Sequence, residues 1–477
     1  MTNMSSRARW LALLVLCLGD LMIVLDVTIV GVALPSIRED LGFSEESLAW
    51  VVNAYLITFG GFLLLGGRFG DLFGHRRLFL LGITLFTLAS AACGFANSQE
   101  MLVGARAVQG IGGAVVSAVA LSLTMTLFTE PAERAKAMGV FGFVASGGGS
   151  IGVLAGGIIT DLFSWHWIFL VNIPIGIAVI VACMVLLPGG GARPADGRLD
   201  VAGAVLVTGS LMLAVYAIVN GNEQGWTSTQ TLGLLAVAVA GIGAFIFRES
   251  RAEAPLMPLG ILKLRSVATS NIVGILWSAA MFAMFFLSAL YLQLVLGYSP
   301  LEVGLAFLPA NLIMGAFSLG LSAKIVMRYG TRLPLVVGMG FVAAGLGLFA
   351  RAPVDASFAV DVLPSMVILG IGIGMAMNPL LLAAMSDVKP EESGLASGIV
   401  NTSYMMGGAL GLAVLASVAA ARTGGDTSPP ALTDGYHAAF VVGTLFAAAA
   451  GVVAAVFMRD VQMSAEAHER EEALHAA

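Results

Sequence analysis

The chain has 477 residues, of which 58% are hydrophobic and only 11% are charged, and its mean hydropathy is +0.95. Soluble globular domains carry about 25% charged residues, so this composition excludes a soluble protein and indicates an integral membrane protein. The net charge is only −6, and no basic cluster of the kind that binds nucleic acid is present.

Long apolar stretches recur along the whole chain. A stretch of about 20 apolar residues can cross the hydrocarbon core of a bilayer as a helix. Such stretches fall near residues 10–34, 48–66, 78–97, 102–127, 137–160, 167–187, 200–220, 231–248, 267–291, 300–323, 334–350, 360–385, 395–420 and 437–458. We therefore predict an all-α membrane protein with fourteen transmembrane helices. The first stretch is too long for a signal-peptide core and precedes no small-residue cleavage site, so we keep it as a span.

The positions of Lys and Arg predict how the chain crosses the membrane, because cytoplasmic loops retain these residues. With the N-terminus inside, the outer loops hold only Arg38, Arg351 and Arg422, and Arg106 lies within a span. Every other Lys and Arg falls on the inner side. We therefore expect a multi-pass protein with both termini in the cytoplasm. High Ala and Gly content favours a bacterial source, and hence the bacterial cytoplasmic membrane.

An internal repeat organises the chain into two related halves. LGFS at residues 41–44 returns as LGYS at 296–299, PAERAKAMG at 131–139 has an echo in PEESGLASG at 390–398, and GGSIG at 148–152 returns as GGALG at 407–411. The nearly constant offset implies two parallel bundles, which is a transporter architecture with the substrate site between the halves. We predict a six-helix bundle at 10–187, two inserted helices at 200–250, a second six-helix bundle at 267–458 and a cytoplasmic tail at 459–477.

The sequence offers no pattern for a metal, a redox centre or a nucleotide. The three Cys residues are too widely spaced for a ligand motif, the five His residues form no ligand pattern, and no G-x-x-x-x-G-K-[ST] stretch is present to hold ATP. We expect no cofactor, no metal and no enzymatic activity, so the energy for transport must come from another source.

Five stretches carry a family resemblance that covers nearly the whole chain. They read LDVTIVGVALP at 25–35, AWVVNAYLITFG at 49–60, GGRFGDLFGHRR at 66–77, RAVQGIGGA at 106–114 and SWHWIFLVNIPIG at 164–176. Together with the fourteen predicted spans, they resemble the drug:proton antiporters of the major facilitator superfamily, a multidrug efflux family. The resemblance implies a major facilitator fold and export of drugs in exchange for protons.

Two charged groups within predicted spans are the main candidates for proton coupling. An ionised carboxylate in hydrocarbon is costly, and intramembrane acids are functional by default. With a rise of 1.5 Å per residue, Asp26 lies about 12 Å and Arg106 about 8 Å from the outer ends of their spans, so they can pair. Asp20 lies about 240° around the helix from Asp26 and is a further candidate. The alternative is a fixed ion pair for packing, with Asp20 lining a pore or packing helices only.

The loop at 66–77 is a candidate gate. The resemblance implies that Gly67, Asp71, Gly74, Arg76 and Arg77 form a latch that closes the inner side. Basic residues are also expected on any cytoplasmic loop. The second copy, KIVMRYGTR at 324–332, has no acid, so the latch should belong to the first half.

The glycines of GGGSIGVLAGG at 147–157 give the fifth span a smooth face on which another helix can approach closely. The face consists of Gly148, Gly152, Gly156 and Gly157. It is compatible with a moving contact or with static packing. Glu302 follows Ser299 and Pro300 in a capping-box pattern, so we predict a helix cap there.

Aromatic and amide side chains within the spans are candidates for a substrate pocket, since such groups can line an adaptable site for bulky ligands. Many residues of this kind face lipid or pack the core instead. The candidates are Asn53, Tyr55, Gln109, Trp277, Phe282, Phe285, Asn311, Asn378, Asn401 and Tyr404.

We therefore predict a secondary transporter that exports small amphipathic compounds, such as antibiotics, in exchange for protons. Its partners would be the substrate, protons and the lipid bilayer, and we expect it to act as a monomer. One alternative is a transporter of a defined metabolite such as a sugar, amino acid or siderophore. A membrane sensor is a second alternative, against which the lack of a soluble output domain argues.

Overall fold

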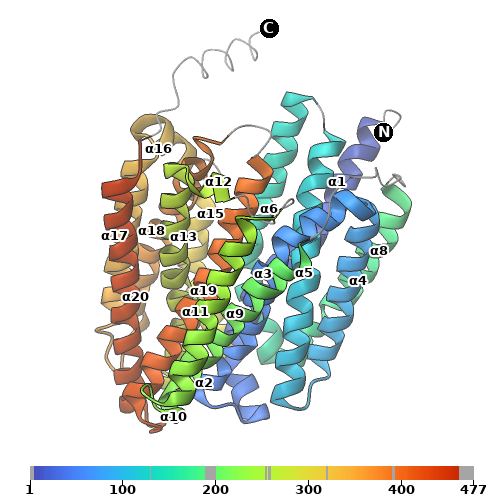
Figure 1. Cartoon of the computed structure of the whole chain (residues 1–477). Coiled ribbons are helices and arrows are strands. Elements are labelled where there is room, and N and C mark those ends of the chain that lie inside the picture. Colours follow the sequence, from blue (N-terminus) through green and yellow to red (C-terminus); the bar gives the residue numbers. More distant parts are fainter. Residues whose placement is uncertain are drawn as a thin grey trace.

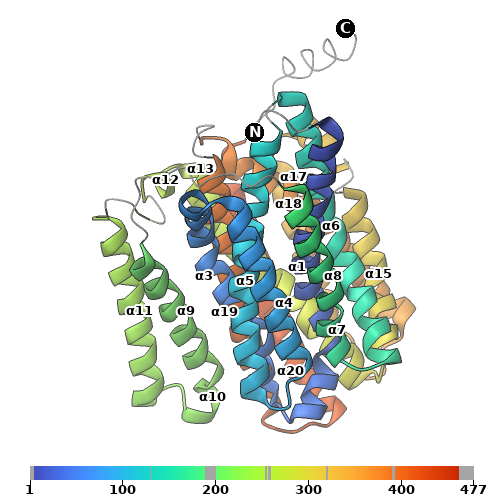
Figure 2. The same cartoon turned by 90° about the vertical axis from the view of Figure 1, so that its right-hand side faces the viewer.

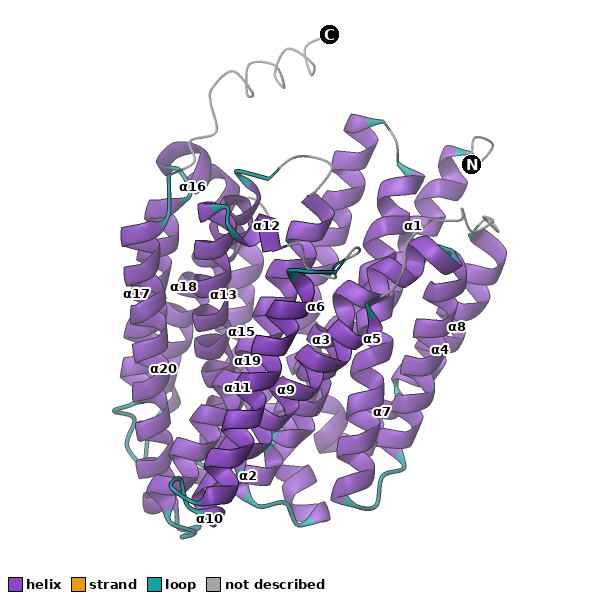
Figure 3. Ribbon diagram, viewed as in Figure 1, coloured by secondary structure: helices purple, strands orange, loops and turns teal. Residues whose placement is uncertain are grey.

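A computed structural model describes residues 5–460 except 129, 188–199, 253–254, 256–258, 318–320 and 389–392. All regular secondary structure in these residues is helical, and the helices form one bundle with loops at its two ends (Figure 3). The start of the first helix and the end of the described chain lie at the same end of the bundle (Figure 1). Most of the predicted tail lies outside the described residues.

The helices coincide with the predicted spans. Within the described residues, ten helices are long and apolar enough to cross a membrane, and four shorter apolar segments fall at the remaining predicted positions, namely Trp50–Leu63, Ile151–Leu162, Val205–Val219 and Pro300–Ala316. The all-α membrane fold is therefore confirmed. The count of fourteen crossings is compatible with the structure and stays a prediction.

The first group of helices comprises the described helices up to residue 186. Its members are α1 (Ser6–Leu41), α2 (Glu45–Leu48), α3 (Trp50–Phe73), α4 (His75–Gly94), α5 (Gln99–Leu127), α6 (Pro131–Leu162), α7 (His166–Leu170) and α8 (Asn172–Leu186). Helix α5 packs closely against both α3 and α4. Glycine makes this possible, because a Cβ at Gly112 would lie only 2.7 Å from the backbone nitrogen of Phe86.

Helix α1 is longer than the first predicted span, which ended near residue 34. It contains Pro35 and continues to Leu41, where Gly42 ends it in a left-handed conformation with φ of 70°. Proline removes one backbone hydrogen bond but does not always end a helix within a membrane protein, because neighbouring groups satisfy the freed carbonyl.

A second group of helices follows the insertion. Its members are α12 (Leu259–Leu262), α13 (Arg265–Phe282), η1 (Ala283–Leu287), α14 (Ser288–Leu290), η2 (Tyr291–Val295), α15 (Pro300–Ala316), α16 (Ser322–Tyr329), α17 (Arg332–Phe349), η4 (Phe358–Val362), α18 (Leu363–Met385), α19 (Ser393–Thr423) and α20 (Pro429–Phe457). Two π-helical turns, η1 and η2, interrupt one continuous apolar span. Such turns occur frequently at functional sites.

The predicted cap at the start of α15 is confirmed. The Glu302 carboxylate accepts a hydrogen bond from the backbone nitrogen of Ser299 at 2.8 Å, and the Ser299 hydroxyl accepts one from the backbone nitrogen of Glu302.

The inserted residues form a helical hairpin of α9 (Val201–Val219), α10 (Gly221–Gln224) and α11 (Thr229–Glu249). Helix α9 packs against both α3 and α19, and Figure 2 shows α9 and α11 at one edge of the bundle. The Ser417 hydroxyl donates to the carbonyl of Ile218 at 3.2 Å, and the Trp50 ring contacts the Tyr216 ring. The insertion therefore covers the seam between the first and second groups.

Contacts join the two groups at mid-helix and toward the end of the bundle where α1 ends, which is the predicted outer side. Helix α6 packs against α15, and α3 packs against α19. The Gln293 amide donates to the carbonyl of Val32 at 2.8 Å. A Cβ at Gly157 would lie 2.5 Å from the carbonyl oxygen of Pro300. The two groups are thus in close contact at the predicted outer side.

Candidate functional site

Asp26 and Arg106 form an ion pair in the interior of the first group. The Arg106 guanidinium donates to one oxygen of the Asp26 carboxylate, and both side chains are buried, with 1% and 0% of their surface exposed. The second carboxylate oxygen accepts hydrogen bonds from the amides of Gln109 at 2.7 Å and Asn172 at 3.1 Å. The predicted pairing is therefore present, with Gln109 of α5 and Asn172 of α8 as additional partners.

A further layer of hydrogen bonds holds the cation side of this site. Arg106 also donates to the carbonyl of Val51 at 2.9 Å and to the Gln109 side-chain oxygen at 2.6 Å. The Gln109 amide donates to the Ser90 hydroxyl at 2.8 Å. A buried charge pair is tolerated only when its remaining donors and acceptors are also satisfied, and this network meets that condition. We refer to Asp26, Arg106, Gln109, Asn172 and Ser90 as the Asp26 network.

Four helices bring the Asp26 network together. Asp26 lies on α1, Ser90 on α4, Arg106 and Gln109 on α5, and Asn172 on the first turn of α8. Gly110 lets α3 approach α5, because a Cβ there would meet the backbone of Tyr55. The sequence analysis missed Asn172 and Ser90. Asn172 is a polar residue within an apolar stretch that had already been singled out, which is the signal that could have found it.

Asp20 is a second buried carboxylate, separate from the Asp26 network. It is 5% exposed and accepts a hydrogen bond from the Ser117 hydroxyl of α5 at 2.8 Å. The two acids have different partners, as the 240° rotation between them predicts. Along α1, Asp20 lies seven residues before Val27, so the two share a helical face.

Tyr55 lies on the Asp26 network, although it was predicted as a pocket residue. Its ring stacks on the Arg106 guanidinium, with 4.4 Å between the guanidinium carbon and the ring centroid, and packs on Phe59. The side chain is fully buried, and its hydroxyl makes no hydrogen bond within the described part of the chain.

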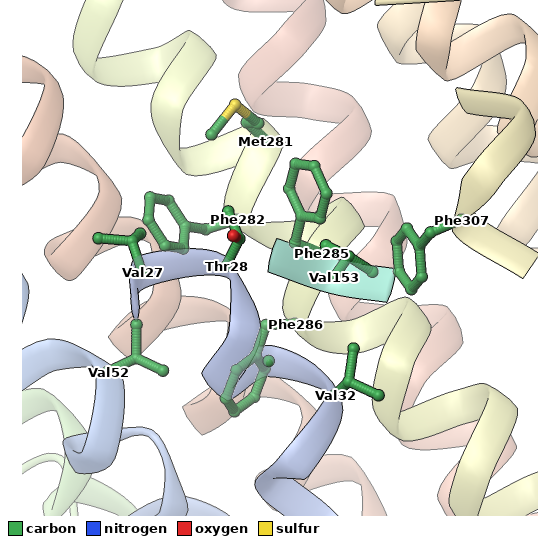
Figure 4. A pocket seen from close by; sticks show the side chains of 11 residues that line it. Val27, Thr28, Val32, Val52, Val153, Met281, Phe282, Phe285, Phe286 and Phe307 are labelled. Carbon is green, nitrogen blue, oxygen red and sulfur yellow. The ribbon is translucent and has the colours of Figure 1, made fainter. Parts of the chain in front are cut away.

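An apolar cavity lies between the first and second groups (Figure 4). The first group contributes Val27, Thr28, Gly31, Val32, Val52 and Val153, and the second contributes Met281, Phe282, Phe285, Phe286 and Phe307. The rings of Phe285 and Phe307 are stacked, with centroids 5.6 Å apart. The cavity holds only about 50 Å³, well below the roughly 300 Å³ of small ligand sites, so a drug-sized molecule needs it to open.

Of the predicted pocket residues, Phe282 and Phe285 line this cavity. Trp277 and Tyr404 lie nearby, since their rings contact each other and the Tyr404 hydroxyl contacts the sulfur of Met281 at 3.3 Å. Asn53 is fully buried next to Val52, and neither its amide nor the Trp277 indole N–H has a partner among the described residues. The candidates outside the cavity lining also include Gln109, Asn311, Asn378 and Asn401.

The predicted gate lies where α3 turns into α4. Gly74 joins the two helices with φ of 92°, a conformation that favours glycine, and Gly67 lies within α3, seven residues before it. Arg76 donates to the carbonyl of Met184 at 2.7 Å, and Arg77 is exposed. The side chain of Asp71 lies outside the described residues, so its role in a latch stays a prediction.

The glycine face of α6 packs on α1 and α15. Cβ atoms at Gly148 and Gly156 would meet Leu21 and Ile29 of α1 at 2.8 and 2.7 Å, and one at Gly152 would meet Leu25. Gly157 faces Pro300 at the start of α15. Close approach of helices at these glycines is therefore present, and whether it moves stays a prediction. No group of three metal-binding side chains occurs among the described residues.

The bundle of membrane-spanning helices, with a buried ion pair and a cavity between two groups, defines a multi-pass membrane transporter. The sequence matches the Major Facilitator Superfamily over residues 16–412, so the chain belongs to this family.

Three relatives have named roles. The puromycin resistance protein of Streptomyces alboniger is 39% identical over 94% of this chain and 90% of the relative. The cephamycin export protein of Amycolatopsis lactamdurans is 38% identical over 93% of this chain and 92% of the relative. The tetracenomycin C resistance and export protein of Streptomyces glaucescens is 34% identical over 87% of this chain and 77% of the relative.

Proposed function

We propose that this chain is a proton-coupled secondary transporter that exports amphipathic drugs or antibiotics by alternating access. The observation that carries the proposal is the Asp26 network, a titratable carboxylate paired with a fixed cation in the membrane interior. The named relatives support the substrate class, because each is described by resistance to or export of an antibiotic.

Asp26, with Arg106, would carry the coupling proton, and Asp20 would be a second proton site. When Asp26 is ionised it holds Arg106 through an ion pair and a hydrogen bond. Protonation removes the charge that Arg106 needs, so the network changes its partners. Since α1 carries Asp26 and also Val27 and Thr28 of the cavity, a change at the ion pair reaches the cavity along one helix.

The cavity between the two groups would expand to bind substrate. Its lining of phenylalanine and methionine suits flat or flexible apolar bodies, because these side chains adapt to different shapes. The unpartnered polar groups of Asn53 and Trp277 would serve the polar part of such a ligand. Substrate would enter from the cytoplasm or the inner leaflet while Asp26 is ionised, and protonation from outside would favour release.

The proposal also specifies how the helix bundles move and how the chain lies in the cell membrane. The predicted bundles at 10–187 and 267–458 would rock against each other, with the hairpin at 200–250 attached to the seam. The chain would act as a monomer in the bacterial cytoplasmic membrane with both termini in the cytoplasm. The latch residues Asp71, Arg76 and Arg77 would set the balance between the inward and outward states.

Purified protein in proteoliposomes tests this function with puromycin as the probe. An imposed pH gradient should drive puromycin movement, and puromycin should in turn move protons. Asp26→Asn should abolish the gradient-driven movement while puromycin exchange at zero gradient continues. Asp361→Asn, in η4 just before α18, is the matched control and should behave as wild type. Full gradient-driven transport in Asp26→Asn would contradict the proposal.

A further inference from the structure

The two buried acids of α1 lie at different depths along the same helices. Six residues separate Asp20 from Asp26, which is about 9 Å along α1. On α5 their partners Gln109 and Ser117 are eight residues apart, which is about 12 Å. Asp20 therefore lies closer to the end of the bundle where α1 begins, the predicted cytoplasmic side.

The hydroxyl of Tyr55 lies between these two levels. A Cβ built on Gly113 would lie 2.8 Å from this hydroxyl oxygen, and Gly113 is midway between Gln109 and Ser117 on α5. The hydroxyl is fully buried and has no hydrogen-bond partner among the described residues.

A buried hydroxyl without a partner calls for a physical explanation, because most buried polar atoms are hydrogen-bonded. The ring alone would give the stacking on Arg106, so packing does not account for the oxygen. The oxygen lies close against Gly113 of α5, where a Cβ would be only 2.8 Å away, so glycine at this position leaves room for the hydroxyl. A buried hydroxyl that lies between the levels of two carboxylates is a position at which bridging water would satisfy it.

We propose that the Tyr55 hydroxyl relays protons between Asp26 and Asp20, a step that rests on the proton-coupled function proposed above. Protonated Asp26 gives its proton through water to the Tyr55 oxygen, while the Tyr55 hydroxyl gives its own proton through water to ionised Asp20. One proton moves inward, Asp26 becomes ionised, Asp20 becomes neutral, and Tyr55 is unchanged. No oxidant, reductant or further reactant is required.

Asp20 is suited to be the inner end of this route. It shares a face of α1 with Val24, Val27 and Gly31, of which Val27 and Gly31 line the cavity between the two groups. Ser117 holds the Asp20 carboxylate toward α5. The ionisable groups around the route are Asp20, Asp26 and Cys17 on α1, Arg106 on α5 and Cys93 on α4, where the Cys93 sulfur contacts Gln109 at 3.7 Å.

The relay predicts a split between proton-driven transport and substrate exchange. Tyr55→Phe keeps the ring on Arg106 but removes the hydroxyl, so gradient-driven puromycin efflux should slow by at least about a hundredfold, the lower end of the effect of a positioned proton-transfer group. Puromycin exchange at zero gradient should stay within about twofold of wild type, because exchange needs no proton step. Tyr291→Phe is the matched control. Its hydroxyl binds the Pro353 carbonyl near the outer side, and it should leave the ratio of the two rates unchanged.

Each outcome decides the inference. Wild-type values of both rates in Tyr55→Phe would overturn the relay. So would equal loss of efflux and exchange in a protein with a wild-type unfolding temperature, since that result assigns Tyr55 to substrate or structure. If Tyr55→Phe does not fold, Asp20→Asn should show the same split, and wild-type efflux in Asp20→Asn would overturn the relay. A wild-type protein that moves no protons would instead contradict the proposed function itself.

Discussion

The interiors of the two helix groups differ in chemistry. The first group buries Asp20, Asp26 and Arg106. In the described residues between 259 and 460, the buried polar side chains are all uncharged, and the part that faces the first group is rich in phenylalanine. The two helix groups thus enclose different interiors. The difference indicates that two tasks, which we propose are proton handling and substrate binding, reside in different parts of the molecule.

The two interiors meet on α1. Asp26 points into the first group, whereas Val27, Thr28, Gly31 and Val32 line the cavity shared with the second group. Consecutive residues of a helix point about 100° apart, so one helix serves both sides. A small rotation or shift of α1 would therefore change the ion pair and the cavity together.

Removal of the buried cation should have the largest effect. Arg106→Ala leaves the Asp26 carboxylate without its counter-charge, and breaking a buried pair in this way costs about 3–5 kcal/mol of stability. Thermal unfolding in detergent should show a large fall in unfolding temperature and transport should be lost. Arg351→Ala, on an exposed loop after α17 that is predicted to lie on the outer side, is the control. An unchanged unfolding temperature in Arg106→Ala would mean that the buried charge pair does not distinguish the interior of the first group from that of the second.

Crowding the contact between α1 and α6 should have the next largest effect. In Gly156→Ala the new Cβ would lie 2.7 Å from the backbone carbonyl of Ile29, so the helices must separate. Overpacking of this kind costs about 1–3 kcal/mol. Gly104→Ala is matched to it, because no atom lies within 4 Å of a Cβ there. Comparison of unfolding temperatures and transport rates tests the prediction, and equal behaviour of the two variants would refute it.

Truncation of an aromatic side chain in the cavity should affect binding and not coupling. Phe285→Ala removes the ring that stacks on Phe307. We expect the Kd for puromycin to rise about tenfold, equivalent to about 1.4 kcal/mol. The number of protons moved per puromycin should stay at the wild-type value. A changed proton ratio with unchanged Kd would reverse the roles assigned to the two interiors.

The smallest effect on stability and transport is expected from substitution of Glu302, the acidic residue at the start of α15 in the second group. Glu302 is the N3 partner of the Ser299 cap of α15, and its removal loses one hydrogen bond, which is worth about 0.5–1.5 kcal/mol. Glu302→Ala should slightly lower the unfolding temperature and leave proton-driven transport at the wild-type rate. Loss of proton coupling in this variant would mean that the second group also handles protons.

Some of this architecture could be predicted from the sequence. Hydropathy located the helices, because a membrane span must be apolar over its whole length. The distances of Asp26 and Arg106 from the outer ends of their predicted spans are similar, which predicted that the two could pair. The spacing of Glu302 from Ser299 predicted the helix cap. These features depend on local sequence or on the membrane as a common reference.

Other features could not be predicted because they depend on which helices are neighbours. Asn172 joins Asp26 only because α8 packs beside α1, and Tyr55 reaches Arg106 only because Gly110 brings α3 close to α5. The cavity lining of Val27 and Thr28 was equally invisible, since small apolar residues carry no signal within an apolar span. The π-helical turns left no trace in hydropathy, because an extra residue per turn does not change composition.

The central claim is that the proton is held at Asp26 and the substrate is held elsewhere. Proton release on addition of saturating puromycin to purified protein in weakly buffered detergent solution tests it most directly. The account predicts that wild type releases protons, that Phe285→Ala releases as many once puromycin is saturating, and that Asp26→Asn binds puromycin without releasing protons. Release from Asp26→Asn equal to that of wild type would contradict the claim.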